Sequence, residues 1–356
     1  MGLTKVTSFL IDPLEPIGTG DNFVLGPGAL AANTTGTTNF ALGQNALSSN
    51  TSGSYNLAIG KQALENNIGG ASPAPGSQTG YGSNNIAIGD QALQENTSGY
   101  ENLAIGQLNL YQNTTGKWNL AIGHRSLIEN TTGVNNIAIG AYVLDKTTTA
   151  QYNLGIGFAA LEGTTTGYEN VAIGDVALNS NTIGYQNVAI GRNAMYGNAQ
   201  GHNNVAVGQA ALMSNGTGAV GNWNTAIGSS SIATITTGYS NTAVGNVSLT
   251  ANTTGYENVA IGAQALQNNT SGIHNTAVGF NANANDPAFV NTTALGYNAT
   301  PTANNQVVLG NSNVTSLVCA AFAAATNAAN DAAAAAAGVP VGGLYRNGSV
   351  LMVRIT

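Results

Sequence analysis

The chain has very few charged residues. Asp, Glu, Lys and Arg make up 6% of its 356 residues, against roughly 25% in a typical soluble domain. Eight basic residues against 15 acidic ones give a formal net charge of −7, so no basic surface is available to hold the phosphates of a nucleic acid, and we expect no nucleic-acid partner. The polarity of the chain comes instead from Asn, Thr and Ser.

Cysteine and long apolar runs are also scarce. Cys319 is the single cysteine, which excludes an internal disulfide framework and favours synthesis in the cytosol. No apolar run approaches the roughly 20 residues of a membrane span, and the first residues lack the basic region and long apolar core of a signal peptide. We therefore expect neither export by the general secretory route nor membrane insertion.

What the chain has in abundance is a glycine-terminated motif, Asn-Val-Ala-Ile-Gly with small variations. It recurs every 17 residues, apart from two longer gaps of 29 and 20 residues and a final gap of 14. So short a period predicts a solenoid, in which each repeat forms one coil and buries its apolar face by stacking on its neighbours. The motif glycines are residues 26, 43, 60, 89, 106, 123, 140, 157, 174, 191, 208, 228, 245, 262, 279, 296 and 310.

Each position of the repeat is numbered here from its motif glycine, which is position 0. Position −4 is Asn in nearly every copy, positions −3 to −1 read aliphatic–Ala–aliphatic, positions +3 and +4 read Ala-Leu, and position +7 is usually Asn before Thr-Thr-Gly. The segment from −3 to −1 predicts a short strand because it is too short for a helix and ends on glycine. The Asn at −4 is expected to stack into an amide ladder from coil to coil.

Side chains alternate along a strand, which leads to a prediction about its two faces. We expect the large aliphatic residues at −3 and −1 to fill the coil interior and the alanine at −2 to face outward. A solenoid that stands alone would carry polar residues outside, so a persistent alanine predicts a surface where a second chain approaches closely. The predicted trimer-interface residues are Ala41, Ala58, Ala87, Ala172 and Ala260.

Outside the repeat, the ends of the chain differ in composition. Residues 316–338 are rich in alanine, which has the highest helix propensity. In the tail, Asn347-Gly348 predicts a type I′ hairpin turn, and because a lone hairpin is marginal in water we expect it to pair with copies of itself. The predicted segments are an N-terminal attachment segment (1–20), a repetitive β-roll shaft (21–315), an alanine-rich helix (316–338) and a C-terminal hairpin trimerisation motif (339–356).

The repeat resembles the head repeats of trimeric autotransporter adhesins of the YadA type. The resemblance lies in the pattern Asn-x-Ala-Ile-Gly-x-x-Ala and, most closely, in residues 293–310, which have the 14-residue spacing of those heads. It implies a homotrimer of left-handed parallel β-rolls. The 17-residue form with Asn-Thr-Thr-Gly is similar to repeats of phage tail fibres, residues 2–7 and 338–348 look like parts of phage structural proteins, and the tail hairpin is similar to the trimerisation tip of phage fibritin.

An aromatic pattern at positions +11 and +12 is the main candidate for a binding surface. Three copies read Tyr-Glu-Asn, which places Glu101, Glu169 and Glu257 beside tyrosines. Aromatic faces next to carboxylates could bind surface sugars; alternatively the rings stack from coil to coil and shield the amide ladder, and we favour this structural interpretation. The loop at 67–83 is another possible contact point. The candidate contact residues are Tyr100, Trp118, Tyr168, Tyr185, Trp223, Tyr239 and Tyr256.

No constellation of catalytic, cofactor-binding or metal-ligating residues stands out. Residues 155–160 match a dinucleotide-binding fingerprint, but they lie within a repeat and lack a βαβ context. His124, His202 and His274 occupy different phases of the repeat, so they predict neither a ladder nor a metal site. We expect a non-enzymatic protein without cofactors or metals.

These observations predict a homotrimeric structural fibre of a phage or phage-like particle, made in the bacterial cytoplasm and located in the virion. Residues 1–20 would dock on tail or baseplate proteins, and the fibre would mediate or support attachment to the host surface, including its polysaccharide. A trimeric bacterial surface adhesin is the alternative, disfavoured because the sequence shows no signal peptide, anchor barrel or coiled-coil stalk. An ice-binding solenoid is disfavoured because the threonines lie next to glycines in turns.

Overall fold

A computed structural model describes residues 21–70, 80–213, 221–316, 326–347 and 350–355. The chain divides into two compact units, which we call the solenoid unit (residues 1–309) and the C-terminal unit (residues 310–356). The predicted attachment segment at 1–20 and Cys319 lie outside the described residues. Each unit is described by itself.

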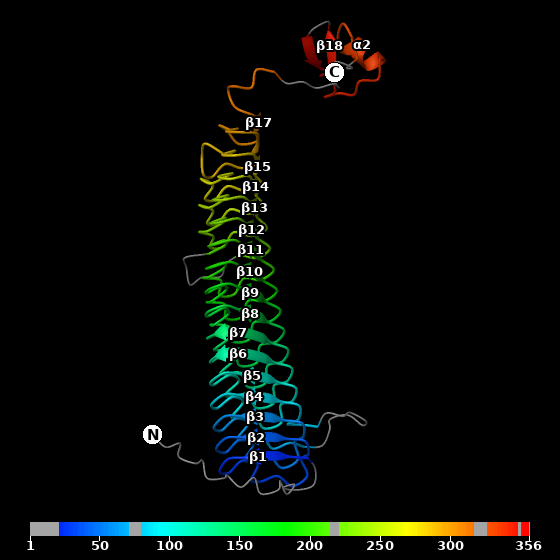
Figure 1. The fold of residues 1–356 in the computed structure, drawn as a ribbon. Helices are drawn as coiled ribbons and strands as arrows, with labels where there is room; N and C mark the ends of the chain where they lie inside the picture. The colour runs from blue at the N-terminus through cyan, green and yellow to red at the C-terminus, as the bar shows by residue number, and fades with distance from the viewer. Residues whose placement is uncertain (1–20, 71–79, 214–220, 317–325, 348–349, 356) are drawn as a thin grey trace, which may run out of the picture. The chain divides into compact units, whose positions relative to one another are not determined.

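The solenoid unit contains a single parallel sheet of 17 strands, in which every strand pairs with its successor in the chain (Figure 1). The pairing is in register, so identical repeat positions face each other, as in Val171↔Val188 and Ile173↔Ile190. This confirms the predicted all-β solenoid of 17-residue coils. The strands are β1 (Phe23–Leu25), β2 (Phe40–Leu42), β3 (Leu57–Ile59), β4 (Ile86–Ile88), β5 (Leu103–Ile105), β6 (Leu120–His124), β7 (Ile137–Ala141), β8 (Leu154–Ile156), β9 (Val171–Ile173), β10 (Val188–Ile190), β11 (Val205–Val207), β12 (Thr225–Ile227), β13 (Thr242–Val244), β14 (Val259–Ile261), β15 (Thr276–Val278), β16 (Thr293–Leu295) and β17 (Val307–Leu309).

The two insertions do not interrupt this pairing. Ile59 of β3 pairs with Ile88 of β4 across the 29-residue gap, and Val207 of β11 pairs with Ile227 of β12 across the 20-residue gap. The extra residues therefore leave the strand register unchanged. The predicted loop at 67–83 and the smaller insertion fall largely on residues 71–79 and 214–220, which lie outside the described residues.

The glycine at position 0 is required by both conformation and space. Gly174, for example, has φ +134, a conformation that L side chains rarely adopt, and a Cβ there would lie 2.7 Å from the carbonyl carbon of Gly191 in the next coil. Successive motif glycines thus let the backbone of one coil lie directly on the next.

The prediction about the two strand faces is wrong, because the structure has them reversed. The alanines at −2, including Ala41, Ala58, Ala87, Ala172 and Ala260, are 0% exposed within the single chain and belong to its own core. The leucines at +4 share this core. Because these leucines fill the narrow interior opposite the strand, a methyl group is what fits at −2, and the larger side chains at −3 and −1 point outward.

Tight turns carry the leucine at +4 into that interior. Non-glycine residues at positions +2, +4 and +12 repeatedly adopt positive φ, as at Val176 (φ 49), Leu178 (φ 50) and Glu169 (φ 55). Such angles are uncommon for non-glycine residues and costly for a bulky one. Burial of the leucine side chain offsets the cost in each coil.

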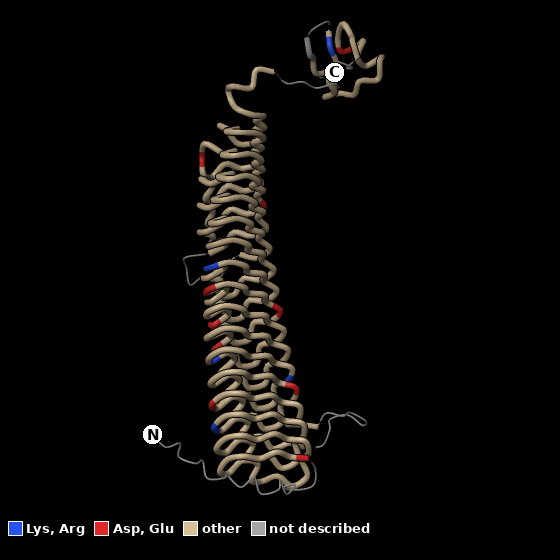
Figure 2. Tube along the Cα trace, viewed as in Figure 1, with Lys and Arg blue, Asp and Glu red and all other residues tan. Residues whose placement is uncertain are grey.

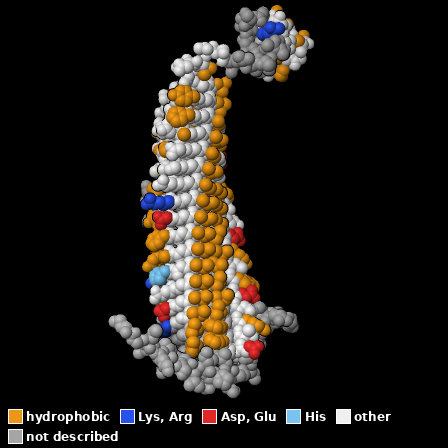
Figure 3. Space-filling view, viewed as in Figure 1, with side chains coloured by type: hydrophobic (Ala, Val, Ile, Leu, Met, Phe, Trp, Pro, Cys, Tyr) orange, Lys and Arg blue, Asp and Glu red, His pale blue; other side chains and the backbone are white. Residues whose placement is uncertain are grey.

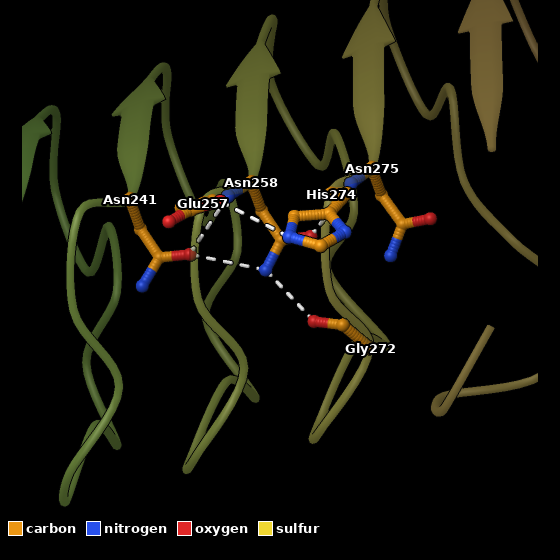
Figure 4. A network of polar contacts seen from close by, with 6 residues as sticks. All are labelled: Asn241, Glu257, Asn258, Gly272, His274 and Asn275. Atoms are coloured by element: carbon orange, nitrogen blue, oxygen red, sulfur yellow. Dashed lines mark hydrogen bonds and ion pairs between the residues drawn. The ribbon is translucent and has the colours of Figure 1, made fainter. Parts of the chain in front are cut away.

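Two ladders of buried asparagines run along the coils. The ladder at −4 confirms the prediction: Asn258 donates from Nδ2 to Asn241 Oδ1 (3.0 Å) and to the Gly272 carbonyl (2.8 Å), while its Oδ1 accepts from the Asn275 backbone (Figure 4). A second ladder, at +7, links Asn113 Nδ2 to Asn96 Oδ1 at 2.7 Å. These bonds satisfy most of the buried amide groups, which would otherwise be costly to bury; Oδ1 of Asn130, Asn181 and Asn269, where the +7 ladder is interrupted or ends, accepts no hydrogen bond from the described residues.

The C-terminal unit combines a short helix with a hairpin. Of the predicted alanine-rich helix at 316–338, residues 317–325 lie outside the described residues. Among the others, the helix α2 covers Asp331–Ala336, residues 326–330 are not helical, and the Asn330 side chain caps the helix by accepting from Ala333 N. Strands β18 (Leu344–Asn347) and β19 (Val350–Val353) form the predicted antiparallel hairpin; Gly348 of its turn lies outside the described residues. The hairpin packs on the helix of its own chain through Tyr345, which is 2% exposed and donates its hydroxyl to Asp331 Oδ1 at 2.8 Å.

Candidate functional site

A mostly aliphatic surface covers the outward face of the strands, and we call it the aliphatic band and define it as the residues at −3 and −1 of β1–β17. Position −3 is Phe in β1 and β2 and Thr in β12, β13, β15 and β16. The side chains of the band are half-buried to exposed, whereas the intervening residue at −2 is buried in nearly every strand. Ile261 is 42% exposed and Val307 67%. Figure 3 shows hydrophobic side chains in columns along the solenoid unit.

The length of the aliphatic band is what sets it apart from scattered surface residues. Seventeen coils at strand spacing extend over about 80 Å, and two neighbouring outward positions of a strand cover about 7 Å, so the band is on the order of 500 Å². This is at the upper end of the apolar patches that typical monomers expose, and patches of this kind mark interaction sites. The band replaces the alanine face as the candidate surface between chains.

The seven aromatic residues predicted as contacts fall into three separate ladders. Tyr81, Tyr100 and Trp118 form the first, Tyr168, Tyr185, His202 and Trp223 the second, and Tyr239, Tyr256 and His274 the third. In the two closest tyrosine pairs, Tyr168–Tyr185 and Tyr239–Tyr256, the ring centroids are 4.9 Å and 4.7 Å apart and the planes are within 4°. The favoured structural interpretation, stacking from coil to coil, therefore describes these rings.

The ladders include two histidines that the sequence analysis set aside. His202 stacks on Tyr185 at 4.6 Å between centroids, and His274 packs edge-on against Tyr256 with its Nε2 3.0 Å from Glu257 Oε2 (Figure 4). The three histidines do differ in phase, but His202 shares position +11 with Tyr185. Comparing the histidines with the tyrosines rather than with each other would have found this contact.

Tyr100 and Trp118 of the first ladder have their polar groups occupied within the chain. Tyr100 is only 8% exposed, so it is a poor candidate for contact with a receptor. Its hydroxyl accepts from Lys117 Nζ at 3.0 Å, and Trp118 Nε1 donates to Glu101 Oε2 at 2.7 Å. The Lys117 ammonium also lies 4.4 Å from the centre of the Trp118 ring, in a cation–π contact.

A groove opens where the second ladder begins, between the turns that follow β7 and β8. Its volume is about 210 Å³, and it is lined by Thr149, Gln151, Tyr152, Thr166, Tyr168 and Glu169. These residues occupy positions +9, +11 and +12 of two successive repeats. We call it the Tyr152–Tyr168 groove.

A further set of aromatic residues, at positions +1 and +2, was not identified from the sequence. Tyr142 lies between His124 and Phe158, with ring centroids 5.5 Å and 5.8 Å away, and Phe280 stacks on Tyr297. The sequence does contain a signal for this set, since aromatic residues recur directly after the motif glycine.

One carboxyl group has a clearly perturbed environment. Burial raises the pKa of Asp145 above its ordinary value of 3.8, the nearby charge of Arg125 opposes this, and Glu129 and Glu162 reinforce it. The closest approach of Arg125 to Asp145 is 3.8 Å.

The described residues offer little support for dinucleotide binding, metal binding or a membrane-spanning helix. Gly155 and Gly157 of the dinucleotide-like stretch lie at the strand β8 and at the bend after it, with no helix following. Within the described ranges, no three His, Cys, Asp or Glu side chains are grouped so that they could hold a metal ion, and no helix there has the length and hydrophobicity to cross a bilayer.

Comparison with known proteins found no protein-family model and no curated protein that matches this sequence.

Proposed function

We propose that this chain is a homotrimeric, non-enzymatic fibre of a phage or phage-like particle, with the solenoid unit as its shaft. The aliphatic band is the observation that carries the proposal. Because every coil presents an outward aliphatic residue at −1, and most coils present a second apolar residue at −3, bands from identical chains can meet along the whole solenoid unit. A closed ring of three such contacts removes the apolar surface from water.

The construction of the solenoid unit suits a shaft. Its coils are linked throughout by in-register strand pairing, and over much of the unit two ladders of buried asparagines add side-chain hydrogen bonds between neighbouring coils. Charged residues are few and scattered along the unit (Figure 2), so apolar packing and hydrogen bonds, rather than ion pairs, hold it together. Such a column would keep its form over a wide range of salt concentration.

The proposed fibre would dock on the particle through residues 1–20, with tail or baseplate proteins as partners, and would reside in the virion. It would mediate attachment to the bacterial surface or hold in place another protein that does so. The exposed aromatic residues of the second and third ladders would face host polysaccharide.

The native mass of the purified chain tests the oligomeric part of this proposal. Light scattering should give three times 35.7 kDa. Ile261→Glu places a charge on the aliphatic band and should lower the mass towards that of one chain, whereas Thr254→Glu, an exposed position at +9 outside the band, should leave the trimer intact. A monomeric wild-type chain would contradict the proposal.

Immunogold labelling tests the location. Label on purified virions supports a fibre of the particle. Label on the bacterial cell surface, with none on virions, would replace the fibre by a surface adhesin.

A further inference from the structure

We propose that the Tyr152–Tyr168 groove binds a single neutral pyranose ring of a surface polysaccharide. This inference rests on the proposed role in attachment and names the class of ligand that one site of the fibre would take. It differs from the general idea of an aromatic stripe, because most rings of the ladders are stacked on each other and only the end of a ladder leaves a ring face free.

Tyr168 supplies that free face. On one side its ring stacks in parallel on Tyr185 of the following coil. On the other side the same position of the preceding coil is Gln151, so within the described residues no ring covers Tyr168 there, and this side lines the groove. Tyr152, one position further along that coil, is 55% exposed and forms the other aromatic wall.

The four central residues alternate in chemistry. Gln151 and Tyr152 of one coil lie next to Tyr168 and Glu169 of the next, so two aromatic residues occupy one diagonal and two polar residues the other. The C–H face of a sugar ring packs on aromatic rings, and its hydroxyl groups need donors and acceptors at the rim. The groove therefore offers aromatic rings and hydrogen-bonding groups close enough together to contact the same sugar ring.

The polar groups of the groove are available for a ligand. Glu169 accepts one hydrogen bond at Oε2, from Gln186 Nε2 at 2.8 Å, and its Oε1 has no partner among the described residues. The side-chain amide of Gln151 likewise makes no hydrogen bond within the described part of the chain. Thr149 and Thr166 are exposed at the same rim and add two hydroxyl groups.

Charge and size narrow the ligand class. The Glu169 carboxylate accepts hydrogen bonds from sugar hydroxyl or acetamido N–H groups, but it repels a sugar carboxylate or phosphate, so a neutral ring is favoured. The volume of about 210 Å³ is below the roughly 300–1,000 Å³ of pockets for drug-sized ligands, which suits one ring of a longer chain. Pyranoses whose hydroxyl groups and linkages are all equatorial, so that both ring faces carry only C–H groups, fit best.

The groove remains open in the proposed trimer. Its residues come from positions +9, +11 and +12, whereas the aliphatic band consists of positions −3 and −1. Covering the band therefore does not use any residue of the groove, and a sugar can bind to the assembled fibre.

Titration of the full-length protein with cellotriose and chitotriose, followed by saturation-transfer NMR, tests the proposal. We expect saturable binding with transfer to the ring C–H protons, and weaker binding of a β-linked mannuronate trisaccharide. Gln151→Tyr should extend the ladder, fill the groove and lower the affinity about tenfold, which corresponds to one lost stacking contact. Tyr168→Ala should act in the same direction.

Tyr297→Ala is the control variant. Tyr297 is 60% exposed and stacks on Phe280 of the preceding coil, outside the second and third ladders. Loss of Tyr297 removes an exposed, stacked ring without touching the groove and should leave sugar affinity within about twofold of the wild type. An equal loss in both variants, unchanged affinity in Gln151→Tyr, tighter binding of the mannuronate, or no saturable binding of either neutral sugar would overturn the proposal.

These results are separable from those for the fibre itself. A trimer that labels on virions but binds no neutral sugar overturns the groove assignment alone. A monomer, or a protein absent from virions, overturns the proposed function whatever the groove binds.

Discussion

Gly155 and Val143 are neighbours in the solenoid core, and one is smaller and the other larger than the residue usual at its position; we call them the exchanged pair. Gly155 stands at position −2, where all other strands except the first and the last carry alanine, and Val143 stands at +3, where other repeats favour alanine. A Cβ built on Gly155 would lie 2.5 Å from Val143 Cγ1. The valine therefore occupies the space of the missing methyl group, and the two substitutions depend on each other.

The expected effect of Gly155→Ala changes sign with residue 143. In the wild type, overpacking the new methyl group against the stiff β-branched side chain of Val143 costs about 1–3 kcal/mol. Alanine also reduces the conformational entropy of the unfolded chain, which stabilises the fold by only about 0.4–1 kcal/mol, so the variant should be destabilised. In a Val143→Ala background the clash is absent, and the same substitution should stabilise by about 0.4–1 kcal/mol. Val143→Ala alone should destabilise through the cavity that it leaves.

Hydrogen exchange of the amides in β7, β8 and β9 is the appropriate assay. A long repeat array need not unfold in a two-state manner, whereas exchange reports the free energy of local opening. As a matched test, the exchanged pair can be moved to the next-but-one coil: Ala177→Val should destabilise, and adding Ala189→Gly should restore protection. Free-energy changes that add to within about 0.5 kcal/mol in both cycles would refute this account of the core.

Three further perturbations probe other parts of the molecule. Asn258→Ala removes the link to both Asn241 and Gly272 and should lower the local free energy of opening around β14 by about 1–3 kcal/mol by hydrogen exchange, whereas Asn246→Ala, an exposed side chain, should have little effect. Burial raises the pKa of Asp145, so the contribution of this group to stability is present below about pH 3.8 and is lost as the pH rises. Asp145→Asn should therefore raise the melting temperature at pH 7 but not at pH 3. Asp175→Asn, at an exposed ion pair, should not raise the melting temperature at pH 7. The hydrogen bond to Asp331 raises the pKa of Tyr345 above 10.0, so the C-terminal unit should lose stability as the pH rises beyond 10, and circular dichroism should find this loss reduced in Tyr345→Phe.

Much of the fold follows from the period of the sequence. A repeat of 17 residues with a fixed glycine predicts stacked coils, the aliphatic–Ala–aliphatic segment predicts the strand, and the asparagine at −4 predicts the ladder. These features are local or depend only on a residue meeting its own counterpart one coil away. In-register stacking brings equivalent residues together, so identity at equal positions is enough to predict contact.

The inside and outside of the coil could not be assigned in the same way. Alternation shows that Ala172 and Ile173 face opposite sides but not which side is the interior. That choice depends on the left-handed turn at positions +2 and +4, which carries Leu178 across the coil. Leucine rarely adopts positive φ, so the Ala-Leu pair alone does not predict this turn, and the larger side chains at −3 and −1 were assigned to a core that has room only for a methyl group at the strand.

The candidate sites were found only in part for a related reason. The tyrosines of position +11 were identified, yet the groove depends on where a ladder ends, which is set by Gln151 rather than by any aromatic residue. The buried state of Tyr100 depends on its neighbours in the adjacent coils. Both properties depend on individual residues that depart from the repeat, and a consensus sequence does not contain them.

In-register pairing also gives the solenoid a unit of length. Strands keep their partners whether 17, 20 or 29 residues separate the motif glycines, so the rise per coil stays at about 4.8 Å. Duplication or loss of one 17-residue segment would lengthen or shorten the column by a single step without altering any other contact along it. The length of the solenoid unit can thus change in evolution through the number of repeats, while an insertion in one coil can change the residues exposed at that coil alone.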